Sequence, residues 1–373
     1  MWSGSRFVAL LMVAALGLGI ADVAIVVHKT SLGPFAPAGA EPAGHAAGNV
    51  TATRGTLPSD PTVPGPVAPA GSASAIPAAA ASPTPAPAVL HTGPWRVGVV
   101  TAHFVDPSRP APARTGGGNG RVLDTVIEYP IEGDPAAPPA PGGPAPAAGG
   151  PFPLVVFVHG FDVTPTTYAA LTEAWARAGY VVASPAFPGE VGGQDGATED
   201  DLPNEPADVR FVISAMTAAG GPVRSAVDAS RIAVAGHSDG GEVAAGVGLD
   251  RCCADPRVRA TIVMSGAELG IPGGGYAGVA HAPALVIQSD GDEVNDPANA
   301  VQLYNDSPGQ MWYLDLVGGR HLEPFLGTDP HWAIVPAVTT DFLDLELKGG
   351  AGRLTRFERD AIVPGQGKLY LKH

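Results

Sequence analysis

The stretch RIAVAGHSDGG at residues 231–241 decides which fold to expect. Residues 232–235 are small or β-branched and apolar, which is typical of a buried strand, and residues 242–249 favour a tightly packed helix of small side chains. Between them, the glycines of Gly-His-Ser-Asp-Gly predict a strained, closely packed turn. Such a turn lifts one hydroxyl clear of a sheet at the start of a helix. Ser238 is therefore a candidate nucleophile.

The motif alone is weak evidence, because the chain holds 50 glycines among 373 residues. A Gly-x-Ser-x-Gly pattern arises readily by chance in such a composition. The stronger test is whether an acid and a base follow downstream in a workable order.

Composition divides the chain into unequal parts. Residues 1–92 hold three basic and three acidic residues, so the whole formal charge of −15 lies in residues 93–373. The size of this part predicts one large domain with a substantial core, and its negative charge suggests solubility. The same charge argues against nucleic acid as a partner, since phosphate binding needs a basic surface.

The N-terminal 30 residues read as an export segment. An apolar stretch covers residues 7–27, interrupted by one acid, and is preceded by a single basic side chain. A cleaved signal peptide and an uncleaved membrane anchor both fit this pattern. The protein is therefore expected to be secreted or held at the cell surface.

Residues 31–92 are rich in Ala, Pro and Gly and predict a disordered linker. A catalytic domain is expected over residues 93–348, followed by a C-terminal tail, residues 349–373, that is packed on the domain or partly disordered. A Pro/Ala/Gly tract at residues 132–151 predicts a surface insertion within the domain.

Within the domain, apolar strands alternate with helices. The pattern indicates an α/β fold with a mostly parallel sheet covered on both faces, and it leaves no room for a large lid. The predicted strands cover residues 96–105, 121–129, 153–158, 180–185, 232–235, 260–264, 284–288 and 311–316, and the helices cover 166–178, 206–219, 242–249, 296–304 and 332–347.

The acid is expected after a late strand of this sheet. Asp292 follows the strand at residues 284–288 and stands beside a glycine, which suits a carboxylate held at a strand end. Asp290 and Asp296 are rivals in the same loop. The base is expected after the next strand, where two glycines precede His321, and His331 is the alternative. The order Ser, Asp, His is the one that such a fold requires.

The oxyanion site needs two backbone amides. One is expected from Asp239, directly after the nucleophile, and the other from Phe161 in the segment His-Gly-Phe that follows an early strand. The Phe161 ring and His237 are predicted to contact the substrate. His159 is expected to pack beneath the loop rather than to act as a second base.

Two further features have plain interpretations. Six acids and no base lie in residues 190–205, which predicts a solvated surface loop or an acidic rim. Cys252 and Cys253 are adjacent, so they are expected to be two thiols at a helix end, with a vicinal disulfide as the alternative. No metal or organic cofactor is expected, and the protein is expected to be a monomer.

The HGF segment, the serine motif, Asp292 and the Gly-Gly-Arg-His segment ending at His321 together resemble the α/β-hydrolase superfamily. The start of the domain, with RVGVV at residues 96–100, resembles bacterial platelet-activating-factor acetylhydrolase-like and dienelactone-hydrolase-like serine esterases. There is also similarity to cutinase-like polyester hydrolases, although these usually carry Met where this chain has Asp239.

The resemblance implies a serine carboxylic ester hydrolase that works through an acyl-enzyme on short- to medium-chain esters, with lipid or polyester esters as further candidates. A serine peptidase or acyltransferase of the same fold and a non-catalytic envelope binding protein are the alternatives.

Overall fold

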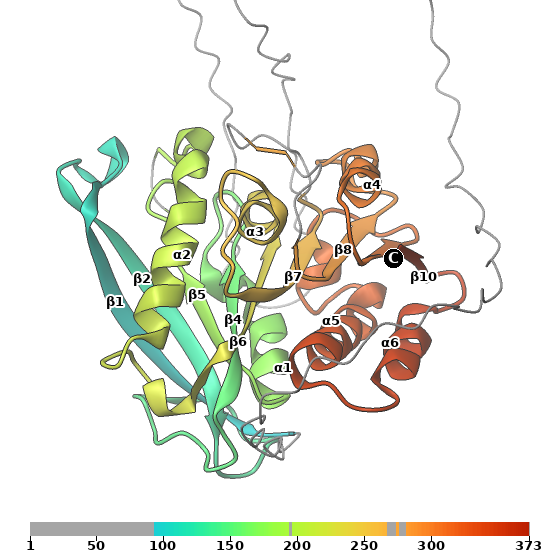
Figure 1. Cartoon of the computed structure of the whole chain (residues 1–373), viewed down its shortest axis with the longest axis horizontal. Helices are drawn as coiled ribbons and strands as arrows, with labels where there is room; N and C mark the ends of the chain where they lie inside the picture. The colour runs from blue at the N-terminus through green and yellow to red at the C-terminus, as the bar shows by residue number, and fades with distance from the viewer. Residues whose placement is uncertain (1–92, 194–195, 267–273, 276–280, 373) are drawn as a thin grey trace, which may run out of the picture. The chain divides into compact units, whose positions relative to one another are not determined.

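A computed structural model describes residues 93–372, apart from 194–195, 267–273 and 276–280. The predicted signal or anchor, the linker and the last residue lie outside the described residues. In the described part, ten strands form one sheet in the order β10-β9-β8-β7-β6-β4-β5-β2-β1-β3 (Figure 1). The strands are β1 Arg96–Pro110, β2 Asn119–Ile131, β3 Ala140–Pro141, β4 Phe152–Val158, β5 Val181–Pro185, β6 Val227–His237, β7 Val258–Met264, β8 Ala284–Ser289, β9 Met311–Leu316 and β10 Gly367–Lys372.

The six central strands, from β5 to β9 in the order of the sheet, run parallel, as the sequence predicts. Antiparallel pairs extend the sheet at both sides, through β2 and β1 next to β5 and through β10 next to β9. Every residue of β4 and β5 is buried, which is the physical reason why these strands are continuous apolar runs rather than alternating ones. The sheet is that of an α/β-hydrolase fold.

Helices cover both faces of the sheet. The described α-helices are α1 Ala169–Arg177, α2 Glu205–Thr217, α3 Asp239–Leu249, α4 Pro297–Asp306, α5 Val335–Leu343 and α6 Arg353–Ala361. Shorter segments are the 3-10 helices η1 Ala113–Thr115, η2 Pro165–Tyr168, η3 Glu199–Asn204, η4 Arg224–Ala226, η5 Glu323–Phe325 and η6 Pro330–Ala333, and the π-helix η7 Asp344–Lys348.

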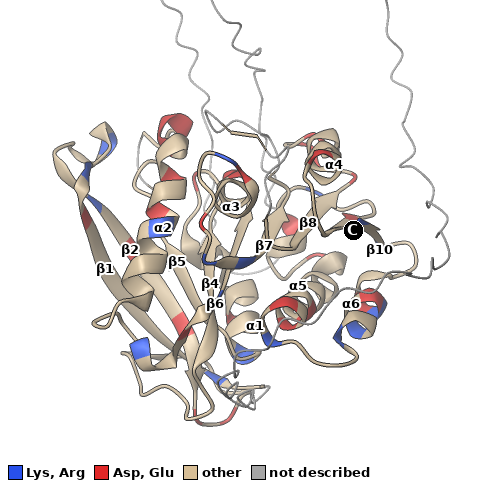
Figure 2. Ribbon diagram, in the orientation of Figure 1, with Lys and Arg blue, Asp and Glu red and all other residues tan. Residues whose placement is uncertain are grey.

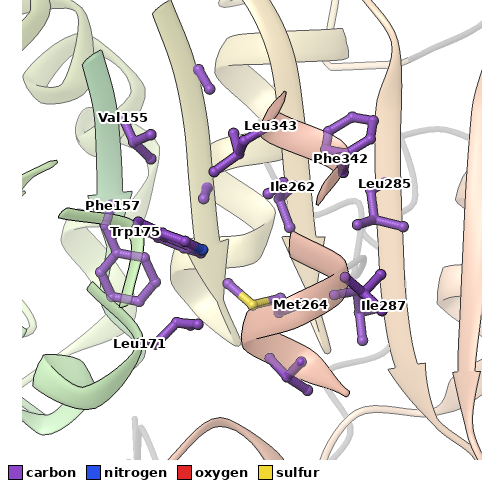
Figure 3. Close-up of a cluster of buried hydrophobic side chains, with 14 of the residues drawn as sticks. Val155, Phe157, Leu171, Trp175, Ile262, Met264, Leu285, Ile287, Phe342 and Leu343 are labelled. Atoms are coloured by element: carbon purple, nitrogen blue, oxygen red, sulfur yellow. The ribbon is translucent and has the colours of Figure 1, made fainter. Parts of the chain in front are cut away.

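Hydrophobic side chains pack on both faces of the sheet, and the pleat of β4 shows how the sheet separates the core on one face from the core on the other. Val155 and Phe157 belong to the core that α1, α5 and α6 cover, and Figure 3 shows them beside Trp175 of α1. Leu154 and Val156, on the opposite side of the same strand, belong to the core that α2 and α3 cover. Alternate side chains of one strand therefore serve two cores, because successive Cβ atoms point to opposite faces.

The C-terminal segment, for which the sequence left open packing on the domain or partial disorder, consists of regular elements packed on the domain. The segment forms α6 and then β10, whose six residues pair with β9 from Gly367 to Lys372. Phe357 of α6 is completely buried against the core. The compact domain therefore continues past residue 348. Two patterns in the sequence are signals for these elements. They are the amphipathic pattern of residues 353–361 and the alternation of apolar and polar residues in GKLYLK at 367–372.

A buried charge cluster attaches this segment to the domain. Asp344 accepts hydrogen bonds from the Tyr180 hydroxyl at 2.7 Å and from Arg356 at 2.8 Å, and it pairs with Lys348 at 2.9 Å and with Arg353. Burial lowers the pKa of Lys348 to about 8. Figure 2 shows acidic and basic residues together on α6, whereas the central strands carry few charges.

Candidate active site

Ser238 lies at the sharp turn between β6 and α3. Its backbone has φ 56° and ψ −127°, a strained conformation for a residue with a side chain. A Cβ atom at Gly236 would lie 1.9 Å from the Gly240 carbonyl oxygen, and one at Gly240 would lie 2.2 Å from that of Val158. The two glycines of the motif are therefore required by backbone packing. The turn has the form of a nucleophile elbow.

The structure brings Ser238, His321 and Asp292 together. Nε2 of His321 lies 3.0 Å from Oγ of Ser238, and Nδ1 of His321 lies 3.0 Å from each carboxylate oxygen of Asp292. The three residues follow β6, β9 and β8, whose carboxyl ends meet at one edge of the sheet. This geometry allows a proton to move from the serine to an imidazole that a carboxylate orients.

Asp292 is held as a carboxylate in a buried position. Its Oδ1 accepts the backbone N–H groups of Val294 and Asn295, each at 2.9 Å, and its Oδ2 accepts the amide of Gln288 at 2.9 Å. Burial acts to raise the pKa of Asp292, but the hydrogen bond and charge of His321 and the two backbone donors outweigh it and lower the pKa to about 2. The side chain stays ionised across the neutral range.

The rival residues have other partners. Asp290 accepts the Gly318 N–H at 2.5 Å, and Asp296 caps α4 by accepting the Ala298 N–H at 2.9 Å. His331 contacts Asp329 through Nδ1 and the Val317 carbonyl through Nε2. None of these contacts involves the nucleophile.

The segment His159-Gly-Phe161 passes beside the nucleophile. A Cβ atom at Gly160 would lie 3.0 Å from Cβ of Ser238. His159 is buried beneath the segment, where Nδ1 donates to the Gly160 carbonyl at 2.8 Å and Nε2 accepts the Phe187 N–H at 3.1 Å. Burial lowers the pKa of His159 to about 4, so it packs as a neutral ring. Asp239 directly follows Ser238 and Phe161 directly follows Gly160, and their amides remain the predicted oxyanion donors.

His237 does not have the predicted place. Only 1% of its surface is exposed, and both ring nitrogens are engaged. Nε2 lies 2.8 Å from the carbonyl oxygen of His321 and Nδ1 lies 2.8 Å from the Tyr168 hydroxyl. The expected contact of His237 with substrate is therefore wrong, because the ring points into the protein. Sequence reasoning missed Tyr168, which has no local signal.

The acidic segment 190–205 is not simply a solvated loop, because several of its carboxylates are buried. Glu190 and Glu205 are fully buried, and their carboxyl oxygens have no hydrogen-bond partner. Burial, followed by the charge of Asp239, raises the pKa of Glu190, and burial above all raises that of Glu205. The Asp239 carboxylate thus lies close to two carboxyls that burial keeps protonated. Asp201 is buried in an ion pair with Arg121 at 2.7 Å.

The two cysteines are not thiols. Cys252 and Cys253 form a vicinal disulfide just after α3. The side chain of Asp250 accepts the N–H groups of Cys252 at 3.1 Å and of Gly275 at 2.8 Å. The disulfide therefore lies in a turn that contacts the connection between β7 and β8.

The described residues hold neither a metal-binding cluster nor a membrane-spanning helix. No group of three or more His, Cys, Asp or Glu side chains in this part of the chain is arranged to hold a metal ion. Among the helices of the same described residues, none combines the length and the hydropathy needed to cross a membrane.

The chain is similar to known esterases. A family model described as chlorophyllase matches residues 120–266, which include Ser238. Among solved structures, a ferulic acid esterase from Streptomyces cinnamoneus is 25% identical, with a TM-score of 0.57 over 72% of this chain and 94% of that chain. No curated protein matches the sequence.

The more specific resemblances, to acetylhydrolase-like, dienelactone-hydrolase-like and cutinase-like enzymes, stay predictions. The sheet topology, the family match and the solved esterase agree on a coarser statement. The protein is a carboxylic ester hydrolase of the α/β-hydrolase fold.

Proposed function

We propose that the protein hydrolyses esters through a covalent acyl-enzyme formed on Ser238, with His321 as the base and Asp292 as the acid that orients it. The observation that supports this most strongly is the 3.0 Å separation of Nε2 of His321 from Oγ of Ser238, with the other ring nitrogen on a buried carboxylate. That arrangement favours the His321 tautomer whose Nε2 accepts the serine proton.

The steps follow from this arrangement. Oγ of Ser238 attacks the ester carbonyl carbon while Nε2 of His321 takes its proton, and the carbonyl oxygen becomes an oxyanion bound by the N–H groups of Phe161 and Asp239. The C–O bond to the alcohol breaks, and His321 returns the proton to the departing alcohol oxygen. Water then repeats the attack, with His321 as its base, and releases the acid and free Ser238.

The similarity to a solved esterase widens the proposed substrate class. A ferulic acid esterase is similar over most of the described domain, so esters of aromatic acids join the short- to medium-chain esters as proposed substrates. Lipid and polyester esters are further candidates. The Phe161 ring is half-buried and comes one residue after the glycine that contacts Ser238, which supports an apolar or aromatic acyl group at this position.

The first experiment compares wild type with Ser238→Ala, His321→Ala and His331→Ala on p-nitrophenyl acetate. The first two variants should lose at least about 10³-fold in kcat, whereas His331→Ala should stay active. A fluorophosphonate probe should label wild type at Ser238. Full activity of Ser238→Ala would overturn the proposal. An ester panel with methyl ferulate, graded p-nitrophenyl esters and a polyester film, beside a matched anilide, then defines the substrate.

We also propose that the enzyme is exported. The apolar stretch at residues 7–27 and the Ala/Pro/Gly-rich residues 31–92 support export, and the vicinal disulfide is in keeping with an oxidising compartment. Expression of the full chain with a C-terminal tag tests this: protein in the medium with a shortened N-terminus indicates a cleaved signal, and full-length protein in membranes indicates an anchor. Protein found only in the cytosol would contradict export in either form.

A further inference from the structure

We propose that Tyr168 and His237 act as positioning residues for the base of this enzyme, holding the His321 backbone in place relative to the nucleophile. The inference rests on the proposed function, since it assumes that His321 is the base. It concerns two buried side chains that hydrogen-bond to each other and to the His321 carbonyl, and their burial keeps them from the substrate.

The hydrogen bonds between these residues have only one consistent direction. The carbonyl oxygen of His321 can only accept, so Nε2 of His237 carries the proton and donates it over 2.8 Å. Nδ1 of His237 is then an acceptor and receives the Tyr168 hydroxyl proton over 2.8 Å. The Tyr168 hydroxyl belongs to η2, which follows β4, and it lies close to Gly160, where an added Cβ atom would be 3.3 Å from it. One continuous chain of hydrogen bonds therefore joins the three segments that follow β4, β6 and β9.

The protonation states of the two side chains do not change near neutral pH. Burial, followed by the charge of His321, lowers the pKa of His237 to about 3. Burial raises the pKa of the Tyr168 hydroxyl well above its ordinary value. His237 therefore stays neutral when His321 takes up the serine proton, which matters because the two rings are centred only 4.8 Å apart. A second positive charge there would oppose the imidazolium.

The backbone of His321 needs an attachment of its own because the residue lies in a glycine-containing loop. Gly318, with φ 76°, and Gly319 precede His321 by three and two residues, and glycine leaves the backbone free to take several conformations. Asp292 holds the ring nitrogen of His321, but it does not hold the backbone. His237 supplies that second attachment through the carbonyl, and its ring is packed against Phe325 at 4.6 Å between centroids. The hydrogen bond from His237 to the carbonyl is therefore an attachment of the His321 backbone, in addition to the attachment of its ring nitrogen to Asp292.

The experiment measures kcat and KM for p-nitrophenyl acetate in four variants. His237→Phe keeps an aromatic ring at this position and removes both hydrogen bonds, so kcat should fall about 10- to 100-fold with KM within about twofold, as expected for a small displacement of a catalytic group. In His237→Gln the amide can donate to His321 and accept from Tyr168, so kcat should recover to within about fivefold of wild type.

The other two variants test the link to Tyr168. Tyr168→Phe should lower kcat by about 3- to 10-fold, and the double variant Tyr168→Phe/His237→Phe should be no slower than His237→Phe alone, because both changes break the same chain of hydrogen bonds. Tyr129→Phe is the matched control. Its hydroxyl also donates a hydrogen bond from a buried ring, to the Pro144 carbonyl at 2.7 Å, but that contact lies on β2 away from the base. It should leave kcat unchanged.

The outcomes separate the two proposals. Ser238→Ala that keeps its activity overturns the proposed function itself. Ser238→Ala that is inactive, with His237→Phe folded and within twofold of wild type in kcat, overturns only the positioning role. The same holds if His237→Gln, with a wild-type melting temperature, is as slow as His237→Phe. Rates of inactivation by a fluorophosphonate should follow kcat across the series, because both reactions need His321 to activate Ser238.

Discussion

The side chain of Asp292 is completely buried, and both of its oxygens lie 3.0 Å from Nδ1 of His321, whose own side chain is 12% exposed. A buried carboxylate is costly unless it is paired and hydrogen-bonded, and here it has three further donors. The arrangement keeps Asp292 ionised next to His321, where it can orient the imidazole and stabilise its charged form.

The first prediction concerns this pair. Asp292→Asn should lower kcat by about 10³- to 10⁴-fold, because an amide favours the wrong tautomer of His321 and cannot stabilise its charged form. Asp290→Asn is the control and should keep activity near wild type. Steady-state kinetics on p-nitrophenyl acetate, with melting temperatures to confirm folding, decide between them. Loss of activity in Asp290→Asn and its retention in Asp292→Asn would reverse the assignment.

The second prediction concerns the backbone at the elbow. Gly240→Ala places a methyl group 2.2 Å from the Val158 carbonyl oxygen, so strand β4 or helix α3 must shift. We expect a loss of about 2 kcal/mol or more in the free energy of unfolding, together with loss of activity. Gly220→Ala is the control, since nothing lies within 4 Å of the added atom. Urea unfolding of both variants measures the difference, and equal stability would contradict the close packing of Gly240 against β4.

The third prediction concerns the buried carboxyls. Glu190 and Glu205 have pKa values raised by burial and by neighbouring carboxylates. The folded state therefore keeps protons that the unfolded state loses above a pH of about 4.3, so these groups make the protein less stable as pH rises from about 4.5 towards their raised pKa. Glu190→Gln and Glu205→Gln should each raise the free energy of unfolding at pH 8 by about 1–3 kcal/mol, with little gain at pH 5. Asp200→Asn, at an exposed position of η3, should change neither value. Variants destabilised at pH 8 would refute the argument.

The fourth prediction concerns acid. The pKa of His237 is lowered to about 3 and that of His159 to about 4, both chiefly by burial, against about 6.5 in the unfolded chain. Their contribution to stability is complete above pH 6.5 and is lost as pH falls through 6.5 towards 4 and 3. His159→Gln should flatten the pH dependence of unfolding between pH 6.5 and 4 relative to wild type, whereas a change at the exposed His103 should not. Parallel slopes in wild type and His159→Gln would rule out His159 as a source of acid sensitivity.

The fifth prediction concerns the disulfide. Cys252 and Cys253 are adjacent, so their bond closes almost no loop and removes little entropy from the unfolded chain. Cys252→Ser/Cys253→Ser should change the free energy of unfolding by less than about 1 kcal/mol and leave kcat unchanged. Denaturation of wild type with and without reductant gives the same comparison. A loss of several kcal/mol would mean that the turn depends on the bond.

Much of the site could be predicted because its signals are local. The glycines around Ser238 are demanded by atoms within a few residues and by one neighbouring strand, and apolar runs identify buried parallel strands without knowledge of their partners. Asp292 and His321 could be chosen by their place after successive strands. The C-terminal β10 was not predicted because the alternating pattern of a six-residue strand at a sheet edge is short and does not specify β9 as its partner.

The sequence by itself determined the α/β class, the elbow at Ser238 and the order of the serine, the acid and the base, because each depends on spacing and hydrophobic pattern along a short segment. Only the tertiary structure decided which way His237 faces, that Tyr168 lies against it from 69 positions away, and that Glu190 and Glu205 are buried without partners. These features arise where segments distant in the chain pack together, and their environments depend on the packing of the whole domain rather than on neighbouring residues.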